Sequence, residues 1–275
     1  MDNTDDETRQ PMRTRLELTD RVAVVTGAGQ GIGRATALAL ADLGAHVAVC
    51  DMAPDGLDDT EREIEARGRR CLRADIDVRD DDLVGAFFAD VDSQLGRIDV
   101  LVNNAGGGFW SPFDGVSPRG ENTLVRENFG TVASCVRHGV PLMNDGAAIV
   151  NVSSVEAFHA APGFAVYAAM KAAVQQFTQS LAVELGGRGI RVNCVAPDMI
   201  PTPGDAQLAA AADPLIEGLH KTPLRRVGTP EECAAVICFL ASDLASFVTG
   251  STLPVDGGTV AAGSWKVALD GSWKM

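Results

Sequence analysis

The sequence predicts an α/β protein with one domain, built on a doubly wound parallel sheet of seven strands with helices on both faces. Three observations lead to this fold. Short β-branched runs alternate along the chain with longer Ala/Leu-rich or amphipathic segments. A glycine-rich turn, "TGAGQGIG" at residues 26–33, directly follows the first apolar run. No Pro/Ser/Gly linker or change of composition divides the 275 residues, so we expect a single domain.

In the first half of the chain, short apolar runs predict strands over residues 21–26, 45–51, 71–75 and 98–103. The segments between them predict helices over residues 31–43, 55–68 and 80–95. The first of these helices is rich in Ala and Leu, and the second is charged, amphipathic and closed by Gly68. A Gly/Pro-rich loop follows from Gly106 to Pro118, and a long helix then runs to about Met143.

The second half repeats this rhythm, with strands expected over residues 147–153, 190–196 and 251–255 and helices over 165–186 and 230–241. Residues 199–222 are rich in Pro and Ala without a clear period, which predicts a substrate lid or binding loop. Residues 1–15 are polar and predict a flexible tail. The C-terminal tail, 259–275, contains GSWK twice. It is either an exposed segment or one that packs on a neighbouring subunit through Trp265 or Trp273.

Composition excludes several classes of protein. Hydrophobic residues make up 46% and charged residues 22%, and the net charge is −14, which argues against binding nucleic acid or an anionic membrane. No uncharged apolar stretch reaches the ~18 residues of a membrane span, and the first 15 residues lack the apolar core of a signal peptide. The six cysteines have no zinc-ligand spacing and are expected to be buried, reduced thiols, so we expect a cytoplasmic protein without a metal.

The glycine-rich turn resembles a phosphate-binding loop, yet it fails the G-x-G-x-x-G pattern in every register and lacks the Gly-Lys-Ser/Thr ending of an ATPase loop. It lies at the first strand-to-helix turn. There the N-terminus of a helix offers free N–H donors and a positive dipole end to a pyrophosphate. Gly31 and Gly33 would let the phosphates approach the backbone and let the helix lie close to the strand.

Asp51 strengthens this interpretation. It ends the predicted second strand, 24 residues after Gly27, where an acid hydrogen-bonds the ribose hydroxyls of adenosine. The alternative is a helix N-cap or turn residue. A carboxylate here would repel a 2′-phosphate, and no Lys or Arg lies in residues 26–33, where Gln30 is found. Both points favour NAD over NADP.

The segment "YAAMK" places Tyr167, the only tyrosine, and Lys171 on one face of a predicted helix. A free phenol has a pKa near ~10, and a lysine ammonium one turn away lowers it. Such a pair also arises by chance. However, Ser154 ends a predicted strand 13 residues before Tyr167, so a hydroxyl and a phenol can face one substrate oxygen. Serine would donate a hydrogen bond to this oxygen and tyrosine would pass the proton.

Together these motifs resemble the short-chain dehydrogenase/reductase family over residues 18–260. The glycine turn is similar to the family's T-G-x-x-x-G-x-G, "NNAG" at residues 103–106 to its N-N-A-G, and "YAAMK" to its Y-x-x-x-K. Ser154 and Asn128 fall where the catalytic Ser and Asn of the family lie. The resemblance implies a single Rossmann-type domain, NAD(P)(H)-dependent oxidation of alcohols or reduction of ketones, and a homotetramer or homodimer.

The resemblance also implies a role for each matching residue. Tyr167 would be the general acid/base, and Lys171 would bind the nicotinamide ribose and lower the tyrosine pKa. Ser154 would orient the substrate oxygen, and Asn128 would hold a water that links Lys171 to solvent. The expected cofactor-binding residues are Gly27, Gln30, Gly31, Ile32, Gly33, Asp51, Met52, Asp77, Val78, Asn104, Ala105, Gly106, Tyr167, Lys171, Pro197, Ile200 and Thr202.

One position departs from the family pattern. Where the family commonly has N-x-x-x-P-G, this sequence has "NCVAPD", with Asp198 in place of Gly. Glycine there often supports an unusual backbone angle, which Asp tolerates better than most residues. A carboxylate near the nicotinamide would stabilise its oxidised, cationic form and favour alcohol oxidation; the alternative is a neutral substitution. Thr202 lies where the family has a carboxamide-binding Thr.

Aromatic and apolar residues dominate the loops expected to bind the substrate. The expected pocket residues are Phe109, Trp110, Glu156, Phe158, His159 and Met199, with Phe113 nearby. They predict a bulky, mostly apolar secondary alcohol or ketone, such as a hydroxysteroid, terpenoid or cyclic alcohol. Glu156 would bond a polar substituent or be a solvated loop acid, and His159 is otherwise a surface residue.

Other functions stay open. An alternative substrate is a hydroxyacyl-CoA, whose phosphates would be bound by four arginines, at positions 119, 126, 225 and 226. A lyase or epimerase would use the same Ser, Tyr and Lys and show transient rather than net NADH formation. A non-catalytic NAD sensor would not need Tyr167.

Overall fold

The computed structural model describes residues 11–203, 220 and 222–274. Its main feature is one seven-stranded sheet with the order β3-β2-β1-β4-β5-β6-β7, in which all neighbouring strands are parallel. The strands are β1 Val22–Thr26, β2 His46–Asp51, β3 Cys71–Asp75, β4 Ile98–Asn103, β5 Met143–Val152, β6 Arg191–Pro197 and β7 Thr252–Val255. This confirms the predicted doubly wound α/β fold. The strand order reverses between β1 and β4, where such sheets bind ligands at their carboxyl ends.

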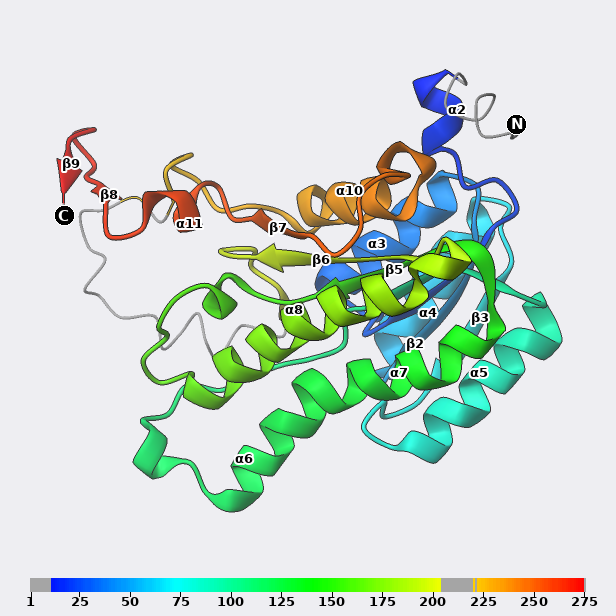
Figure 1. Ribbon diagram of the computed structural model, residues 1–275, viewed down its shortest axis with the longest axis horizontal. Coiled ribbons are helices and arrows are strands. Elements are labelled where there is room, and N and C mark those ends of the chain that lie inside the picture. Colours follow the sequence, from blue (N-terminus) through cyan, green and yellow to red (C-terminus); the bar gives the residue numbers. More distant parts are fainter. Residues whose placement is uncertain (1–10, 204–219, 221, 275) are drawn as a thin grey trace.

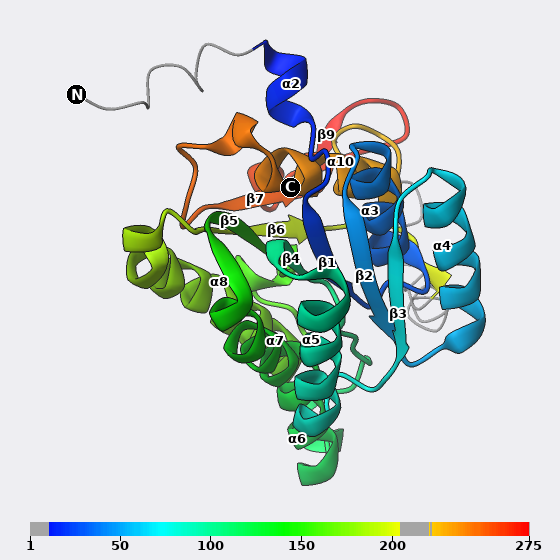
Figure 2. The ribbon, with the colours of Figure 1, turned by 90° about the vertical axis from the view of Figure 1, so that its right-hand side faces the viewer.

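Helices cover both faces of the sheet, as Figures 1 and 2 show from two sides. One face carries α3 (Gly31–Asp42), α4 (Pro54–Ala66) and α10 (Pro230–Ala241), and the other carries α5 (Asp81–Leu95), α7 (Thr131–Gly139) and α8 (Ala165–Leu185). Each face has its own apolar core, because successive side chains of a strand point to opposite sides. In β1, Ala23 and Val25 pack in the first core, and Val22 and Val24 in the second.

The prediction of one continuous helix over residues 118–143 is wrong. The segment consists of α6 (Pro118–Val125), a π-helical turn η2 (Arg126–Gly130), α7 and a 3-10 turn η3 (Val140–Leu142). One extra residue per turn at η2 changes which side chains face the sheet. The following strand β5 also begins earlier than predicted, because a bulge shifts its register from Ile98–Met143 to Val100–Ala148.

The predicted flexible tail is also corrected within the described residues. Met12–Leu16 forms a short helix, α2, and Arg15 Nη2 donates a hydrogen bond to the Asp243 carbonyl at 2.7 Å. This contact fixes a segment whose composition alone indicates flexibility. Residues 1–10 of the tail, and residues 204–219 and 221 of the predicted lid, lie outside the described part of the chain.

The C-terminal tail folds into a short helix and a hairpin. Helix α11 (Thr259–Ala262) is followed by strands β8 (Lys266–Val267) and β9 (Trp273–Lys274), which pair antiparallel. In this pairing Lys266 lies opposite Lys274 and Val267 lies opposite Trp273, so the two GSWK copies meet only at their final lysines. Val267 is buried, whereas Trp265 and Trp273 are exposed at 48% and 57%. The tail is thus neither wholly exposed nor unstructured.

Candidate active site

Helix α8 and the end of β5 bring the predicted serine, tyrosine and lysine to one place. Lys171 Nζ lies 5.5 Å from the centre of the Tyr167 ring, one helical turn away. It donates a hydrogen bond to the carbonyl of Val152, the last residue of β5, at 3.1 Å. Ser153 Oγ ties the strand end to α8 by donating to the Lys171 carbonyl at 2.8 Å. Ser154 is buried and follows directly, so the three side chains converge at the carboxyl end of the sheet.

The Lys171 ammonium is buried, with 5% of the residue exposed. Burial lowers the pKa of Lys171 to about 8, and Cys194 and Glu127 oppose this shift. The cause is desolvation, which disfavours the charged form. The lysine therefore changes its charge near neutral pH, which is typical of groups in active sites.

Asn128 lies in the π-helical turn η2 and is fully buried. Its Nδ2 donates to the Gly107 carbonyl at 2.8 Å and to the Leu124 carbonyl at 3.0 Å. Its Oδ1 is buried and accepts no hydrogen bond within the described residues. A Cβ added at Gly106 would lie 3.1 Å from this oxygen and 3.3 Å from Lys171 Nζ, so both atoms flank the same glycine. An unpaired buried acceptor of this kind is unusual and indicates a site for a water or ligand.

The glycine turn after β1 closes tightly on itself. Gly27 and Gly31 have positive φ angles of 66° and 55°, which favour glycine. A Cβ at Gly33 would overlap the Gly27 carbonyl, so α3 approaches the strand only with glycine there. Gln30 is the extended residue immediately before α3, and Ile32 lies in its first turn. The N-terminus of α3 is thereby presented at the strand end, as anion binding requires.

The NNAG turn fastens this loop. Asn104 Nδ2 donates to the carbonyls of Thr26 and Gly27, both at 3.0 Å. Thr26 Oγ1 accepts hydrogen bonds from the backbone N–H groups of Asn104 and Ala105, both at 3.1 Å. Asn104 therefore holds the two loops together. Thr26 is missing from the predicted site residues, although it is the first residue of the motif and could have been found there.

Asp51 ends β2 beside the glycine turn. One carboxylate oxygen accepts from Gly29 N at 2.9 Å and the other from Ala53 N at 3.1 Å. The alternative that Asp51 is a turn residue is thus also realised, because its carboxylate orders two backbone segments. The prediction missed Gly56 of α4, where a Cβ would overlap the Gly29 carbonyl. The sequence gives no local signal for this contact between elements that are far apart in the chain.

Asp77 and Val78 lie beyond β3, close to Met52. Arg79 binds the Asp77 carboxylate through Nε and Nη2, at 2.9 and 2.7 Å to its two oxygens. This hydrogen bonding lowers the pKa of Asp77, against desolvation. The same guanidinium lies 3.3 Å from Met52 Sδ. Val78 is buried.

The last of the predicted cofactor residues lie at the end of β6 and after it. Pro197 ends the strand, and Ile200 is buried. A Cβ added at Gly31 would lie 3.0 Å from Thr202 Cβ, which places Thr202 over the glycine turn. The positive φ expected near Asp198 falls one residue later, on Met199, at 49°. Asp198 itself therefore does not replace glycine in a left-handed conformation.

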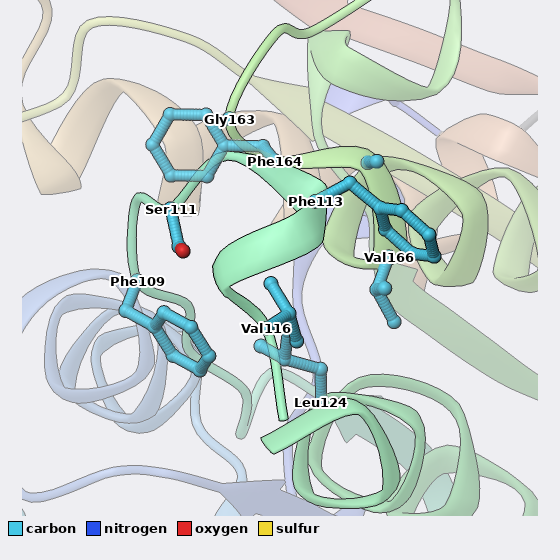
Figure 3. Close-up of a pocket in the computed structure, with 9 residues that line it drawn as sticks. Phe109, Ser111, Phe113, Val116, Leu124, Gly163, Phe164 and Val166 are labelled. Carbon is cyan, nitrogen blue, oxygen red and sulfur yellow. The ribbon is translucent and has the colours of Figure 1, made fainter. Parts of the chain in front are cut away.

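The predicted substrate residues separate into two groups. Phe109 and Phe113, with residues near the start of α8, line a small apolar pocket (Figure 3). Trp110 lies outside this pocket and packs on Gly163. Phe158 and Met199 also lie outside it and are exposed at 44% and 37%. The pocket meets the catalytic helix through Phe164, whose ring packs edge-on to Tyr167 at 6.2 Å between centroids.

The second group is charged. Glu156 Oε2 lies 3.2 Å from His159 Nε2, and the Glu156 backbone N–H donates to Ser154 Oγ at 3.3 Å. Burial raises the pKa of Glu156, and nearby Asp198 adds to this effect, whereas His159 opposes it. Burial likewise raises the pKa of Asp198, against a hydrogen bond from Thr259. The acid, the histidine and Asp198 are therefore electrostatically coupled beside Ser154.

Among the helices of the described residues, none combines the length and apolar character that a membrane crossing requires. The described residues also contain no group of three or more His, Cys, Asp or Glu side chains placed to bind a metal ion. All six cysteines lie in the described part of the chain and are free thiols, and five of them are buried.

A parallel sheet with a glycine turn at its switch point and a Tyr-Lys helix beside the next strand end defines a dinucleotide-dependent oxidoreductase class. The sequence model of the family described as "Enoyl-(Acyl carrier protein) reductase" matches residues 27–260. A cyclohexanol dehydrogenase of Rhodococcus sp. (strain TK6) is 40% identical over 271 residues, covering 90% of this chain and 98% of that protein. A cis-4-hydroxycyclohexanecarboxylate dehydrogenase of Sinomonas cyclohexanicum is 41% identical over 88% of this chain and 97% of that protein.

The fold has close structural counterparts as well. A short-chain dehydrogenase from Mycobacterium paratuberculosis bound to NAD superposes with a TM-score of 0.83 at 32% identity, covering 89% of this chain and 99% of that one. The chain belongs to the short-chain dehydrogenase/reductase family. It is a short-chain alcohol dehydrogenase or ketone reductase that uses a nicotinamide dinucleotide.

Proposed function

We propose that the protein interconverts a bulky, mostly apolar secondary alcohol and its ketone with NAD(H), through Ser154, Tyr167 and Lys171. The observation that carries the proposal is the buried Lys171 one turn from Tyr167 on α8, hydrogen-bonded to the end of β5 beside Ser154. These groups provide a proton donor/acceptor, a cation and a hydroxyl at one strand end. General acid–base catalysis of a carbinol requires such a set.

In this mechanism, Ser154 donates a hydrogen bond that orients the substrate oxygen. Tyr167 removes the hydroxyl proton during alcohol oxidation and returns it during ketone reduction. Asn128 Oδ1, which is buried and accepts no hydrogen bond within the described residues, holds a water that passes the proton from Lys171 toward solvent. A bound nicotinamide dinucleotide supplies the hydride acceptor or donor.

The residues present fit such a cofactor. The glycine turn and the N-terminus of α3 would bind the pyrophosphate, because only glycine fits at Gly33 against the Gly27 carbonyl. Asp51 would bind the adenosine ribose, and Lys171 the nicotinamide ribose. Ala105, Gly106, Pro197, Ile200 and Thr202 would line the nicotinamide side.

We propose NAD rather than NADP. The Asp51 carboxylate would repel a 2′-phosphate. Arg79 reaches Met52, next to Asp51, but its guanidinium already binds Asp77 with both ends of its fork. A guanidinium that is neutralised in this way contributes little to binding the 2′-phosphate of NADP.

For the substrate, we propose a cyclic alcohol, terpenoid or hydroxysteroid. Phe109, Trp110 and Phe158 present exposed aromatic surface, and the pocket that Phe109 lines reaches Tyr167 through Phe164. The alternative is a hydroxyacyl-CoA intermediate. It is less well supported because Arg226 is engaged with Glu232 and Arg126 with the Arg79 carbonyl, so neither is reserved for a coenzyme phosphate. From the family resemblance we also propose a homotetramer or homodimer in the cytoplasm.

The test is a screen of steroid, terpenoid and cyclic secondary alcohols, followed by NADH absorbance with NAD⁺ and with NADP⁺. We expect net NADH formation with at least one cyclic alcohol and a clear preference for NAD⁺. Tyr167→Phe should lower turnover by roughly 10²–10⁴-fold while NAD binding persists. Transient NADH without net formation would instead indicate a lyase or epimerase, and unchanged function in Tyr167→Phe would indicate a sensor.

A further inference from the structure

Three titratable side chains meet beside the substrate-facing serine. Glu156 follows Ser154 by two residues, and its backbone N–H is bonded to Ser154 Oγ. Its carboxylate pairs with His159, at 3.2 Å between Oε2 and Nε2. Asp198 enters from the end of β6, where its backbone N–H donates to the Val255 carbonyl at 3.2 Å. Asp198 is close enough to raise the pKa of the Glu156 carboxyl.

The charge balance of this group is negative. The group contains two carboxylates and one imidazole, which pairs with Glu156, and Asp256 adds a further carboxylate that influences Asp198. The side chains of Glu156 and His159 are 29% and 44% exposed, so they border the solvent-accessible side of the site and are only partly screened. The Lys171 ammonium is buried and donates its hydrogen bond to the Val152 carbonyl at the end of β5, not to a carboxylate of this group. An anion that enters beside Ser154 therefore meets uncompensated negative charge.

We propose that Glu156, His159 and Asp198 form a charge filter that selects uncharged alcohols and excludes those with a carboxylate or phosphate near the reacting carbinol. This inference rests on the proposed function, whose substrate class it narrows to neutral alcohols. Repulsion between like charges in a partly buried site is much stronger than in water. Rejection of the wrong charge is also a common basis of specificity. His159 does not reverse the repulsion of an anionic substrate, because its ring is already paired with the Glu156 carboxylate.

Two alcohols of similar ring size provide the test: cyclohexanol and cis-4-hydroxycyclohexanecarboxylate, each measured as kcat/KM with NAD⁺. We expect the wild type to prefer cyclohexanol by tenfold or more. Glu156→Gln and Asp198→Asn should each shift the ratio toward the carboxylate by about tenfold, which corresponds to ~1.4 kcal/mol. The shift should arise mainly in the KM of the carboxylate substrate.

Two control variants test the direction of the change in this kcat/KM ratio and whether the change is specific to the three residues. His159→Gln removes the ring that pairs with Glu156 and should not shift the ratio toward the carboxylate. Glu184→Gln changes an exposed acid on the same α8 helix as Tyr167 and should leave the ratio unchanged. Equal ratios in wild type, Glu156→Gln and Asp198→Asn, or a wild-type preference for the carboxylate, would overturn the filter.

A binding measurement separates this inference from the proposed function. Cyclohexanol and cyclohexanecarboxylate are titrated calorimetrically into the protein saturated with NAD⁺, where no turnover of the carboxylate occurs. Weaker binding of cyclohexanecarboxylate, relieved in Glu156→Gln, supports the filter even if neither alcohol is oxidised. Oxidation of cyclohexanol without any difference in binding between wild type and variant leaves the function intact and rejects the filter.

Discussion

The two sides of the site are built differently. On the side of β1 and β2, backbone groups and glycines make the contacts: Gly27 bonds to the β2 backbone at Cys50, and Asn104 bonds to the carbonyls before and within the turn. On the side of α8 and β6, exposed aromatic rings and charged side chains face the solvent. The first side has little freedom to vary, because most of its contacts are to the main chain. The contacts on the second side are made by side chains and change when those side chains are replaced, so we expect substrate choice to be set there.

This difference predicts opposite responses to substitution. A change at the glycine turn should damage cofactor binding and stability together. A change on the substrate side should alter kinetics with little effect on folding. The predictions below test this contrast, beginning with the largest effect.

Gly33→Ala should break the cofactor side. Its Cβ would overlap the Gly27 carbonyl and come within 2.5 Å of Asn104 Nδ2, so α3 must move away from the sheet. Overpacking against backbone costs about 3 kcal/mol. We expect a clear loss of thermal stability and at least a hundredfold loss of NAD⁺ affinity, measured by thermal unfolding and calorimetry.

Gly186→Ala is the matched control. Gly186 has an ordinary helical backbone, with φ −57°, and a Cβ there meets nothing within 4 Å. This variant should keep wild-type NAD⁺ affinity and be as stable as the wild type or slightly more so. Similar losses in both variants would show that the glycine turn has no special packing requirement.

Lys171→Met tests the proposed role of the buried lysine on α8. Keeping a buried ammonium charged at pH 7 costs stability, because burial lowers the pKa of Lys171 from 10.5 to about 8. Replacing it with an apolar side chain of similar length should stabilise the fold by about 2 kcal/mol, since loss of the bond to the Val152 carbonyl offsets part of the gain. Turnover should fall severely. Thermal unfolding and NADH assays of the same preparation measure both effects.

The difference in stability between the wild type and Lys171→Met should depend on pH. Between about pH 8 and 10.5, the unfolded lysine keeps its proton and the folded lysine loses it. Wild-type stability should therefore rise in this range relative to Lys171→Met, and the gap between the two proteins should close. A gap that stays constant from pH 7 to 10.5 would contradict a buried, charged lysine.

The geometry of the glycine turn and of the strand end at Asp51 could be predicted from the sequence, because both follow from local spacing. The turn from Gly27 to Gly33 and the position of Asp51 at a strand end depend only on neighbours in the chain. The π-helical turn around Asn128 and the fit of Gly56 against the glycine turn were not predictable, because each depends on packing between distant segments. The positive φ at Met199 was expected one residue earlier, since a motif fixes where a turn lies more closely than which residue adopts its conformation.

Asp198→Gly tests the smallest expected effect, a change in the affinity for NAD⁺ relative to NADH. If the Asp198 carboxylate lies close to the nicotinamide, it should favour the cationic NAD⁺ over NADH. Since Asp198 is half-buried but also bonded to Thr259, we expect a few-fold decrease in the ratio of NAD⁺ to NADH affinity, measured by calorimetry or fluorescence. An unchanged ratio would mean that the substitution in this family position is neutral.

Asp198→Asn separates charge from shape. It keeps the size of the side chain and removes the charge, so it should reproduce the effect of Asp198→Gly if the effect is electrostatic. Because burial raises the pKa of Asp198, the wild-type preference for NAD⁺ should also weaken as the pH falls through that raised value, while both variants stay constant. If only the glycine variant changes the ratio, the backbone at β6 and Met199 rather than the carboxylate controls the nicotinamide side. The substrate half would then be as dependent on main-chain geometry as the glycine turn.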